Sequence, residues 1–251
     1  MSVLAALAIL GVGLAAGTLN TIVGSGSLIT FPTLLALGYP PVVANVSNTV
    51  GLVTGSISGA IGYRRELGGQ RARLRVLGTA SLAGGLTGAL LLLALPESVF
   101  RNVVPLLILV ACALVALQPR LARRVAAGDG PARAHGGPLL FAAVYFTGVY
   151  GGYFGAAQGV MLIALLGIFL DDSLQRLNAA KNVLAALVNG IAALLFVVLA
   201  DVDWAVAGLL AAGAIVGGQV GATLGRRISP GWLRLVIVVV GVAVAVRLLV
   251  R

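Results

Sequence analysis

Long apolar segments separated by short polar loops run along almost the whole chain. Several of these segments reach the roughly 18 residues that a helix needs to cross about 30 Å of hydrocarbon. In the first half, the apolar helices that we expect span about residues 3–19, 27–37, 42–62, 76–95 and 102–117. In the second half, they span about residues 139–153, 160–170, 178–199, 204–224 and 232–249. The pattern predicts an all-α polytopic membrane protein.

Two of these segments are too short to cross a bilayer, and each follows a glycine-rich break. Segment 27–37 follows Gly24-Ser25-Gly26, and segment 160–170 follows the break at 148–159. At about 1.5 Å per residue, each short segment spans about half of the hydrocarbon. Glycine permits positive φ, and Pro32 lacks a backbone donor, so both residue types favour an interrupted helix. We therefore predict that each short segment forms a re-entrant or strongly bent hairpin with the segment before it.

The second half of the sequence repeats the plan of the first half. The positions that match at an offset of 133 residues are 84–89 with 217–222, Asn45 with Asn178, and Asn48 with Lys181. Gly24 matches Gly155 at the close offset of 131 residues. Small residues let membrane helices approach closely. We therefore expect the glycines that 84–89 and 217–222 share to form contact surfaces between helices.

These matches indicate a single membrane transport domain, 1–251, built from two structural repeats. We expect the first repeat at about 1–118, a solvated linker at about 119–137 and the second repeat at about 138–251. Each repeat contains a broken or re-entrant helix hairpin plus three transmembrane helices.

The basic loops predict the orientation of the chain in the membrane. By the positive-inside rule, the arginine-rich loops at about 64–75, 120–133 and 226–234 face the cytoplasm. The turn at 201–203 has no basic residue and is expected outside. Equivalent segments of the two repeats then run in opposite directions, which defines inverted-topology repeats. This topology puts both termini outside.

Composition excludes several other classes of protein. Charged residues make up 10% of the chain, against about 25% in a soluble domain. The net charge of +10 lies mostly in short arginine-rich loops, so it indicates membrane topology and no nucleic-acid partner. With Cys112 the only cysteine and His135 the only histidine, we expect no disulfide within the chain, no metal site and no cofactor. Protease, hydrolase and P-loop motifs are missing, so we expect no enzyme. We also find no pattern of a cleavable signal peptide.

The two glycine-rich breaks form the predicted substrate site. Inverted repeats with broken helices at matching positions are typical of transporters whose site lies near the membrane midplane. The helix that starts after each break presents free N–H groups and the positive end of its dipole, which favour a small oxyanion. The candidate substrate-binding residues are Asn20, Gly24, Ser25, Gly26, Ser27, Asn45, Ser47, Asn48, Gly155, Gln158, Asn178, Lys181 and Asn182.

Lys181 is the only lysine of the chain and lies about one turn inside its predicted helix. An ionisable side chain within a membrane span is energetically costly and is functional by default. The alternatives are that Lys181 reaches the cytoplasmic interface or pairs with Asp171 or Asp172. Since no carboxylate lies in the middle of a predicted span, Lys181 is also the one candidate for a proton carrier.

Two further polar features have competing interpretations. The polar cluster at 45–49 either donates to a bound anion, or forms hydrogen bonds between helices or an N-cap. Asn189, in the middle of the predicted 178–199 helix, favours hydrogen bonding between packed helices.

Several stretches resemble those of a known family. In the first half they are Gly17-x6-Gly24-Ser25-Gly26-Ser27 leading to Pro32-Thr33-Leu34-Leu35, Ala44-Asn45-Val46-Ser47-Asn48, and Ser58-Gly59-Ala60-Ile61-Gly62-Tyr63-Arg64-Arg65. In the second half they are Gly148-x6-Gly155 and Asn178-Ala179-Ala180-Lys181-Asn182. Over nearly its whole length the chain resembles the sulfite exporter TauE/SafE family, also called the toluene sulfonate uptake permease family. Ser25 and Ser27 stand where that family usually has glycine.

The resemblance implies secondary transport of sulfite, sulfonates or related sulfur-containing anions across the bacterial cytoplasmic (inner) membrane. Together with the repeats, it leads us to expect a multi-pass carrier that works by alternating access. Its expected partners are a small anionic substrate and the lipid bilayer, and the sequence gives no oligomeric state. The alternatives are a carrier of a different small solute, or a membrane assembly or accessory protein that does not transport.

Overall fold

The computed structural model describes residues 1–126, 137–224, 235, 238–239, 242–243 and 245–246. Within these ranges the secondary structure is helical and contains no strand. The elements in chain order are α1 (Val3–Ile22), α2 (Ser27–Ala36), α3 (Pro41–Gly62), the 3-10 helix η1 (Arg64–Leu67), α4 (Arg71–Ala94), α5 (Glu97–Ala126), α6 (Gly137–Tyr153), α7 (Gln158–Phe169), α8 (Leu174–Leu199) and α9 (Trp204–Leu224).

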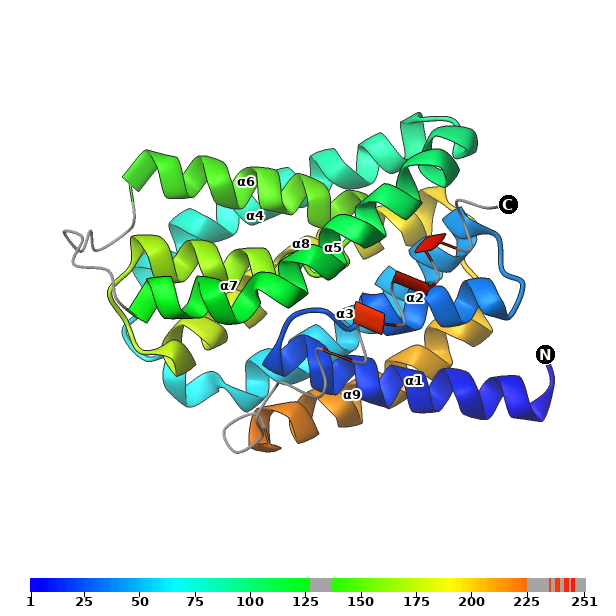
Figure 1. Ribbon diagram of the computed structural model, residues 1–251, viewed down its shortest axis with the longest axis horizontal. Coiled ribbons are helices and arrows are strands. Elements are labelled where there is room, and N and C mark those ends of the chain that lie inside the picture. The colour runs from blue at the N-terminus through cyan, green and yellow to red at the C-terminus, as the bar shows by residue number, and fades with distance from the viewer. Residues whose placement is uncertain (127–136, 225–234, 236–237, 240–241, 244, 247–251) are drawn as a thin grey trace.

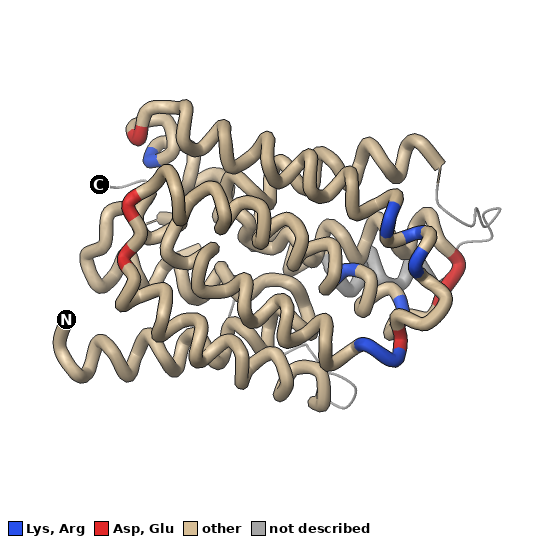
Figure 2. Tube along the Cα trace, turned by 180° about the vertical axis from the view of Figure 1, so that it is seen from behind, with Lys and Arg blue, Asp and Glu red and all other residues tan. Residues whose placement is uncertain are grey.

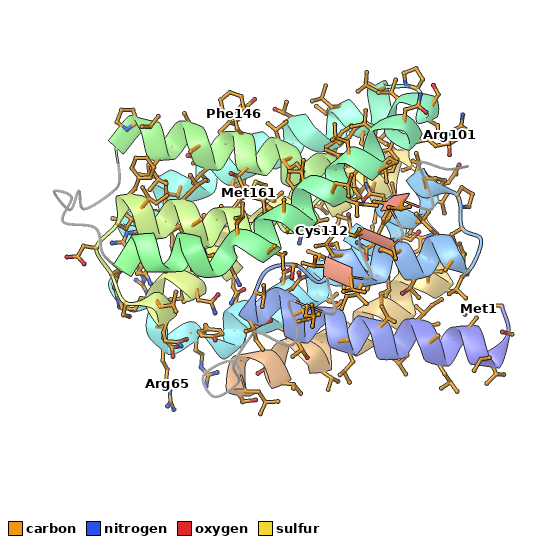
Figure 3. The ribbon with its side chains drawn as sticks, viewed as in Figure 1. Met1, Arg65, Arg101, Cys112, Phe146 and Met161 are labelled. Atoms are coloured by element: carbon orange, nitrogen blue, oxygen red, sulfur yellow. The ribbon has the colours of Figure 1, made fainter. Side chains whose placement is uncertain are left out.

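Five of these helices are long and apolar enough to cross a membrane: α1, α4, the Glu97–Leu117 part of α5, α8 and α9. Helices α2 and α7 are apolar but short, as their sequences predict. Large apolar side chains project outward along the bundle (Figure 3), and Phe146, Leu194 and Val198 are 68%, 66% and 77% exposed. Such an apolar surface suits contact with lipid. The prediction of an all-α polytopic membrane protein is therefore confirmed.

The predicted segments correspond to α1–α9, with differences at some ends. Helix α4 begins at Arg71, inside the expected basic loop, and α5 continues to Ala126, inside the expected linker. Arginine and leucine are good helix formers, so a helix can continue past the end of its apolar run. The rest of the expected linker, the basic loop at 226–234 and most of the segment at 232–249 lie outside the described residues.

The helices form two hairpins that enter from opposite ends of the bundle. In Figure 1, α1 starts at the end marked N and α2 returns toward that end. Helix α6 starts at the opposite end, and α7 returns toward it. Helix α3 runs away from the N-terminal end, and α8 runs back toward it. Helix α9 packs against α1 and α3, while α4 packs against α6 and α8.

The glycines of the matching 84–89 and 217–222 stretches lie where helix backbones touch. A Cβ placed on Gly88 of α4 would lie 2.0 Å from the carbonyl oxygen of Val149 in α6. A Cβ on Gly217 of α9 would lie 2.1 Å from that of Leu14 in α1. The expectation that these glycines form close-contact surfaces is confirmed, and no larger residue fits there without separating the helices.

Apart from the buried Lys181, the charged residues of the described chain divide between the two ends of the bundle (Figure 2). One end carries the arginines of η1 and the start of α4, including Arg65, which is labelled in Figure 3. The opposite end carries Met1, Arg101 and the acidic 201–203 turn. By the positive-inside rule, we expect the arginine-rich end to face the cytoplasm. This orientation, which leaves the N-terminus outside, stays a prediction.

At the arginine-rich end, Asp172 joins the two halves of the chain. Its carboxylate accepts from Arg73 at 2.9 Å and from Arg176 at 2.7 Å. Burial raises the pKa of the Asp172 carboxyl, but hydrogen bonds from Arg73, Arg176 and the Ser173 N–H outweigh that effect and hold the pKa below its ordinary value. The network ties the start of α4 to the start of α8.

We predict that Gly88→Ala lowers the free energy of unfolding by about 1–3 kcal/mol, the range for overpacking a tight contact. The added methyl group must push α6 away from α4. Thermal unfolding in detergent measures the effect. The control is Gly208→Ala in α9, where a Cβ meets nothing within 4 Å, so its stability is expected to stay the same or rise. Equal effects of both substitutions would contradict the close contact.

We predict that Asp172→Asn destabilises the protein by about 1–2 kcal/mol at neutral pH, because it removes the charge that both arginines bind. The pKa of Asp172 is lowered by folding, so its contribution is present at neutral pH. That contribution is lost as the pH falls below the ordinary value of 3.8 and through the folded pKa. Unfolding temperatures of the two proteins should therefore converge on acidification. Asp171→Asn, at an exposed neighbour outside the network, is the control.

Candidate functional site

The two glycine-rich breaks meet in the middle of the bundle. The Gly159 N–H donates to the Gly24 carbonyl oxygen at 3.1 Å. A Cβ on Gly24 would lie 2.3 Å from the Gly159 Cα, and a Cβ on Gly159 would lie 2.4 Å from the Gly24 Cα. Both breaks also turn through a left-handed glycine, with φ of +85° at Gly24 and +80° at Gly155. The close contact of the two backbones therefore leaves no room for a side chain at Gly24 or Gly159.

Local hydrogen bonds hold each break in shape. Helix α1 ends where the N–H groups of Val23 and Gly24 both donate to the Leu19 carbonyl. The Asn20 side-chain oxygen then accepts from the Gly26 N–H at 2.6 Å, which fixes the start of α2. In the second break, Ala157 adopts a left-handed φ of 59°, and the hydroxyl of Tyr150 donates to the Ala156 carbonyl at 2.7 Å.

Three side chains of α8 donate hydrogen bonds to the free carbonyl groups at the end of α1. The Lys181 Nζ donates to the carbonyl oxygens of Asn20 and Thr21 at 3.0 and 3.1 Å. The amides of Asn178 and Asn182 donate to the Thr21 oxygen at 3.1 and 3.4 Å. Carbonyls in the last turn of a helix have no partner within the helix, and the negative end of the helix dipole favours a cation there.

Lys181 follows neither of the two alternatives considered for it. Its side chain is 1% exposed and does not reach the interface. Asp172 is bound by Arg73 and Arg176, and no carboxylate of the described chain forms an ion pair with Lys181. Lys181 is therefore a buried side chain whose nitrogen is held by backbone carbonyls.

The polar residues of α3 form hydrogen bonds to three other parts of the bundle. The Asn45 amide donates to the Tyr153 carbonyl at the end of α6, at 3.0 Å. Asn48 accepts from the hydroxyl of Thr30 and donates to that of Ser27, both in α2. The Ser47 hydroxyl accepts from the Asp203 N–H at 2.9 Å. Asn45 and Asn48 therefore hold segments next to the two breaks, and Ser47 holds the turn before α9.

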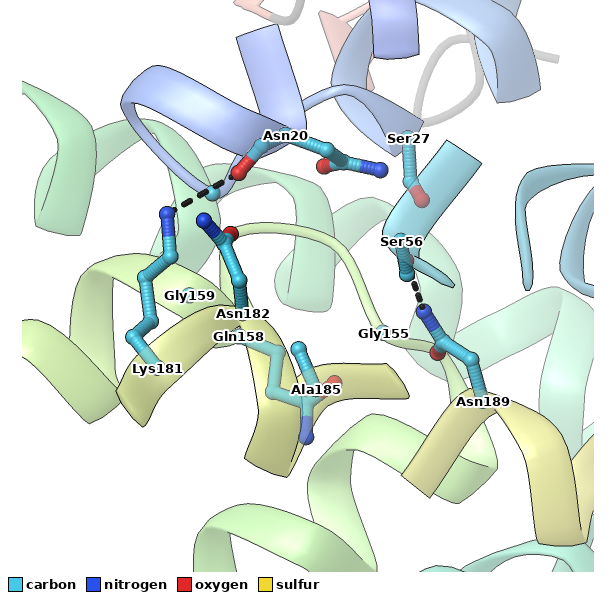
Figure 4. A pocket seen from close by; sticks show the side chains of 11 residues that line it. Asn20, Ser27, Ser56, Gly155, Gln158, Gly159, Lys181, Asn182, Ala185 and Asn189 are labelled. Atoms are coloured by element: carbon cyan, nitrogen blue, oxygen red, sulfur yellow. Dashed lines mark hydrogen bonds between the residues drawn. The ribbon is translucent and has the colours of Figure 1, made fainter. Parts of the chain in front are cut away.

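A small cavity lies beside the crossing of the two breaks (Figure 4). The space open to the centre of a water-sized molecule is about 20 Å³, where one water needs about 10–15 Å³. In this conformation the cavity has room for water but not for a larger solute. The residues that line it are Asn20, Gly24, Ser27, Ser56, Gly155, Gln158, Gly159, Lys181, Asn182, Ala185 and Asn189.

Residues that line the cavity keep hydrogen-bond donors that the described chain does not use, although the Gln158 amide packs against Gly151 of α6 and its nitrogen does not face the open space. Gln158 is 3% exposed, and its Nε2 has no hydrogen-bond partner among the described residues. Gly151 of α6 leaves the space for this amide, since a Cβ there would lie 2.4 Å from it. The Ser27 hydroxyl accepts from Asn48 and keeps its own proton. The Lys181 ammonium has three N–H groups and uses two of them on carbonyls.

The predicted site residues divide into those on the cavity wall and those behind it. The ones on the wall are Asn20, Gly24, Ser27, Gly155, Gln158, Lys181 and Asn182. The ones that are not on the wall are Ser25, Gly26, Asn45, Ser47, Asn48 and Asn178. Of the second group, Asn45, Asn48 and Asn178 act through backbone or side chains at the breaks, and the buried Ser25 hydroxyl has no partner in the described chain.

Four residues of the cavity wall are absent from the predicted set: Ser56, Gly159, Ala185 and Asn189. The Asn189 amide donates to the Ser56 hydroxyl at 3.2 Å, so it does bond between helices, as expected, and it also faces the cavity. The sequence of α8 contained a signal that could have found two of them. Asn182, Ala185 and Asn189 follow one another at spacings of three and four residues, so they share a helix face with a predicted site residue. The described residues contain no cluster of side chains that can hold a metal ion.

Comparison with known proteins gives a consistent result. A model of the family described as "Sulfite exporter TauE/SafE" matches residues 9–248. The chain is 28% identical over 242 residues to "Probable membrane transporter protein YfcA" of Escherichia coli strain K12, covering 95% of the chain and 87% of that protein. It is 27% identical over 215 residues to a "Probable membrane transporter protein" of Haemophilus influenzae, covering 85% and 82%. No solved structure matches at a significant level.

We predict that Gly24→Ala abolishes the folded state or lowers the free energy of unfolding by about 3 kcal/mol or more, because strain at positive φ adds to the clash with Gly159. Gly38→Ala is the matched control: Gly38 has φ of +92°, but a Cβ there meets nothing within 4 Å. It shows the strain alone, about 1 kcal/mol. Thermal unfolding of the two purified variants compares them. Similar losses would mean that the breaks need not touch.

Proposed function

Because this chain belongs to the sulfite exporter TauE/SafE family of membrane transporters, we propose that it carries small sulfur-containing anions, such as sulfite or sulfonates, by alternating access. Its relatives are bacterial, and its apolar helices make it a multi-pass protein of the bacterial inner membrane. Membership of this family also means that the protein is a transporter and not an enzyme.

The observation that carries the choice of an anion is the charge of the cavity wall. Lys181 supplies one positive charge, and no carboxylate lies on the wall or pairs with the ammonium in the described chain. The Ser27 hydroxyl adds a neutral donor, and the unpartnered Gln158 amide, which packs against Gly151 in this conformation, adds a second one when it turns toward the anion. A buried donor without a partner is energetically costly, and a bound oxyanion relieves this cost by accepting from it. A wall of donors around one cation selects a small anion.

The closed cavity supports alternating access. On the cytoplasmic side, the Arg73–Asp172–Arg176 network joins the two halves of the chain. Toward the outer end, Phe31, Phe100 and Phe154 pack edge to face, with ring centroids 5.2 to 6.4 Å apart. An anion that is larger than the present cavity enters only when one of these closures opens. The account therefore requires an open state on each side of the membrane.

Inverted-topology repeats fit the same cycle, and we include them in the proposal. The supporting observations are paired: Asn178 caps the end of α1, and its match Asn45 caps the end of α6. Gly24 and its match Gly155 both have positive φ. Helices α3 and α8 run in opposite directions (Figure 1). In such a design, rocking one repeat against the other exchanges the two closures.

The polar lining weighs against an accessory protein that does not transport. Such a protein needs a partner surface, and a buried polar cavity with unpartnered donors would only destabilise it. A carrier of a neutral polar solute remains the second candidate, because the amides of Asn182 and Asn189 also face the cavity. The two candidates differ in the role of Lys181: an anion carrier needs its positive charge for binding, whereas a carrier of a neutral solute does not.

We predict that sulfite and methanesulfonate raise the unfolding temperature of the purified protein, whereas neutral dimethyl sulfone does not. By mass action, an anion present at 100 times its Kd stabilises by about 2.7 kcal/mol. Gln158→Leu should weaken binding at least about tenfold, because it removes a donor that has no other partner. Arg101→Ala, an exposed residue at the outer end, should bind as the wild type does.

Flux into proteoliposomes tests the proposal at the level of transport. The wild-type protein should take up labelled sulfite with saturation, and Gln158→Leu should lower kcat/KM by about tenfold or more. Stabilisation by the sulfone that equals that by the anions would favour the neutral-solute carrier. Equal flux with wild type and Gln158→Leu would contradict the site.

A further inference from the structure

The Lys181 nitrogen lies where two carbonyl oxygens at the end of α1 converge. This Nζ lies at hydrogen-bond distance from two successive carbonyl oxygens, of Asn20 and Thr21, at the end of α1 (Figure 4). In membrane carriers with interrupted helices, carbonyls at the ends of half-helices are the groups that coordinate a free coupling cation. Here the same kind of carbonyl pair is filled by a side chain of α8.

The carbonyl pair has few other partners that can satisfy it. The N–H groups of Val23 and Gly24 both go to Leu19, so the helix itself leaves the Asn20 and Thr21 oxygens free. Asn178 and Asn182 donate to Thr21, but in the described chain the only hydrogen bond to the Asn20 oxygen comes from Lys181. Without Lys181, this buried carbonyl must take another cation or donor.

The other break shows that a positive charge is not a general requirement for capping. At the end of α6, the Tyr153 carbonyl accepts from the neutral amide of Asn45. The sequence match of Lys181 is Asn48, which instead bonds to Thr30 and Ser27 in α2. The cation is therefore specific to one of the two breaks, the one whose carbonyls border the cavity.

We propose that Lys181 is a tethered substitute for a coupling cation: its side-chain nitrogen fills a cation site made by the Asn20 and Thr21 carbonyls. The site would otherwise take a small cation such as Na⁺ or methylammonium. The charge that stabilises the bound anion then stays with the protein and is not transported. The coupling part of this inference rests on the proposed transport function, whereas the cation site does not.

The test of the cation site is chemical rescue of stability, which needs neither substrate nor transport. Lys181→Ala leaves the carbonyls and an empty space, and Lys181→Met fills the same space with an apolar side chain of similar length. We expect methylammonium chloride, compared with choline chloride, to raise the Tm of Lys181→Ala by about 3 °C or more. Sodium chloride should give a smaller rise. The wild type and Lys181→Met should not respond.

Two results would overturn the proposal. One is that Lys181→Ala responds to methylammonium and Na⁺ no more than Lys181→Met does. The other is that the wild type is stabilised by these cations over choline, which means that Lys181 does not fill the site. If Lys181→Ala does not fold, Lys181→Ser leaves similar space and is measured in its place.

The coupling consequence has its own measurement. Wild-type anion flux should be unchanged when all external and internal Na⁺ is replaced by choline, and a loss of flux would show that a free cation is still required. If no anion is transported under any condition, the proposed function fails while the rescue result stands by itself. The two failures are therefore distinguishable.

Discussion

A helix that is interrupted inside a membrane leaves backbone groups that lipid cannot satisfy, and the rest of this structure follows from that constraint. The end of α1 exposes the carbonyls of Asn20 and Thr21, and side chains of α8 cover them. The crossing of the breaks brings the Gly24 and Gly159 backbones into contact, with one hydrogen bond between them. Each hairpin is thus stabilised by residues of the other half of the chain, so neither half can move without rearranging the site.

The same bonds place a positive charge next to the cavity. Lys181 is 1% exposed, and its charge is balanced by helix carbonyls and by no carboxylate of the described chain. Such a charge attracts an anion while the carbonyls hold the ammonium in place. The structural role of Lys181 and its proposed role in binding are two uses of one ammonium group.

Much of the fold could be predicted from the sequence because its signals are local. The lengths of the apolar runs gave α1–α9, and the glycines around Gly24 and Gly155 gave the breaks. The ends of α4 and α5 were less predictable, because helix formation does not stop where hydrophobicity stops. For the site, residue type suggested Lys181 and Gln158. It could not show that Asn45 and Asn48 hold helix ends while Ser56 and Asn189 reach the cavity, because those roles depend on packing between distant segments.

The central claim is that one small anion binds between Lys181, Gln158 and the crossing of the two breaks. A crystal structure of the protein with selenite, whose selenium scatters anomalously and whose shape matches sulfite, tests it most directly. The account predicts one strong anomalous peak within hydrogen-bond distance of the Lys181 Nζ and the Gln158 Nε2, in a cavity wider than the present one. Anomalous density only at the arginines of the arginine-rich end, with the central cavity unchanged, would contradict it.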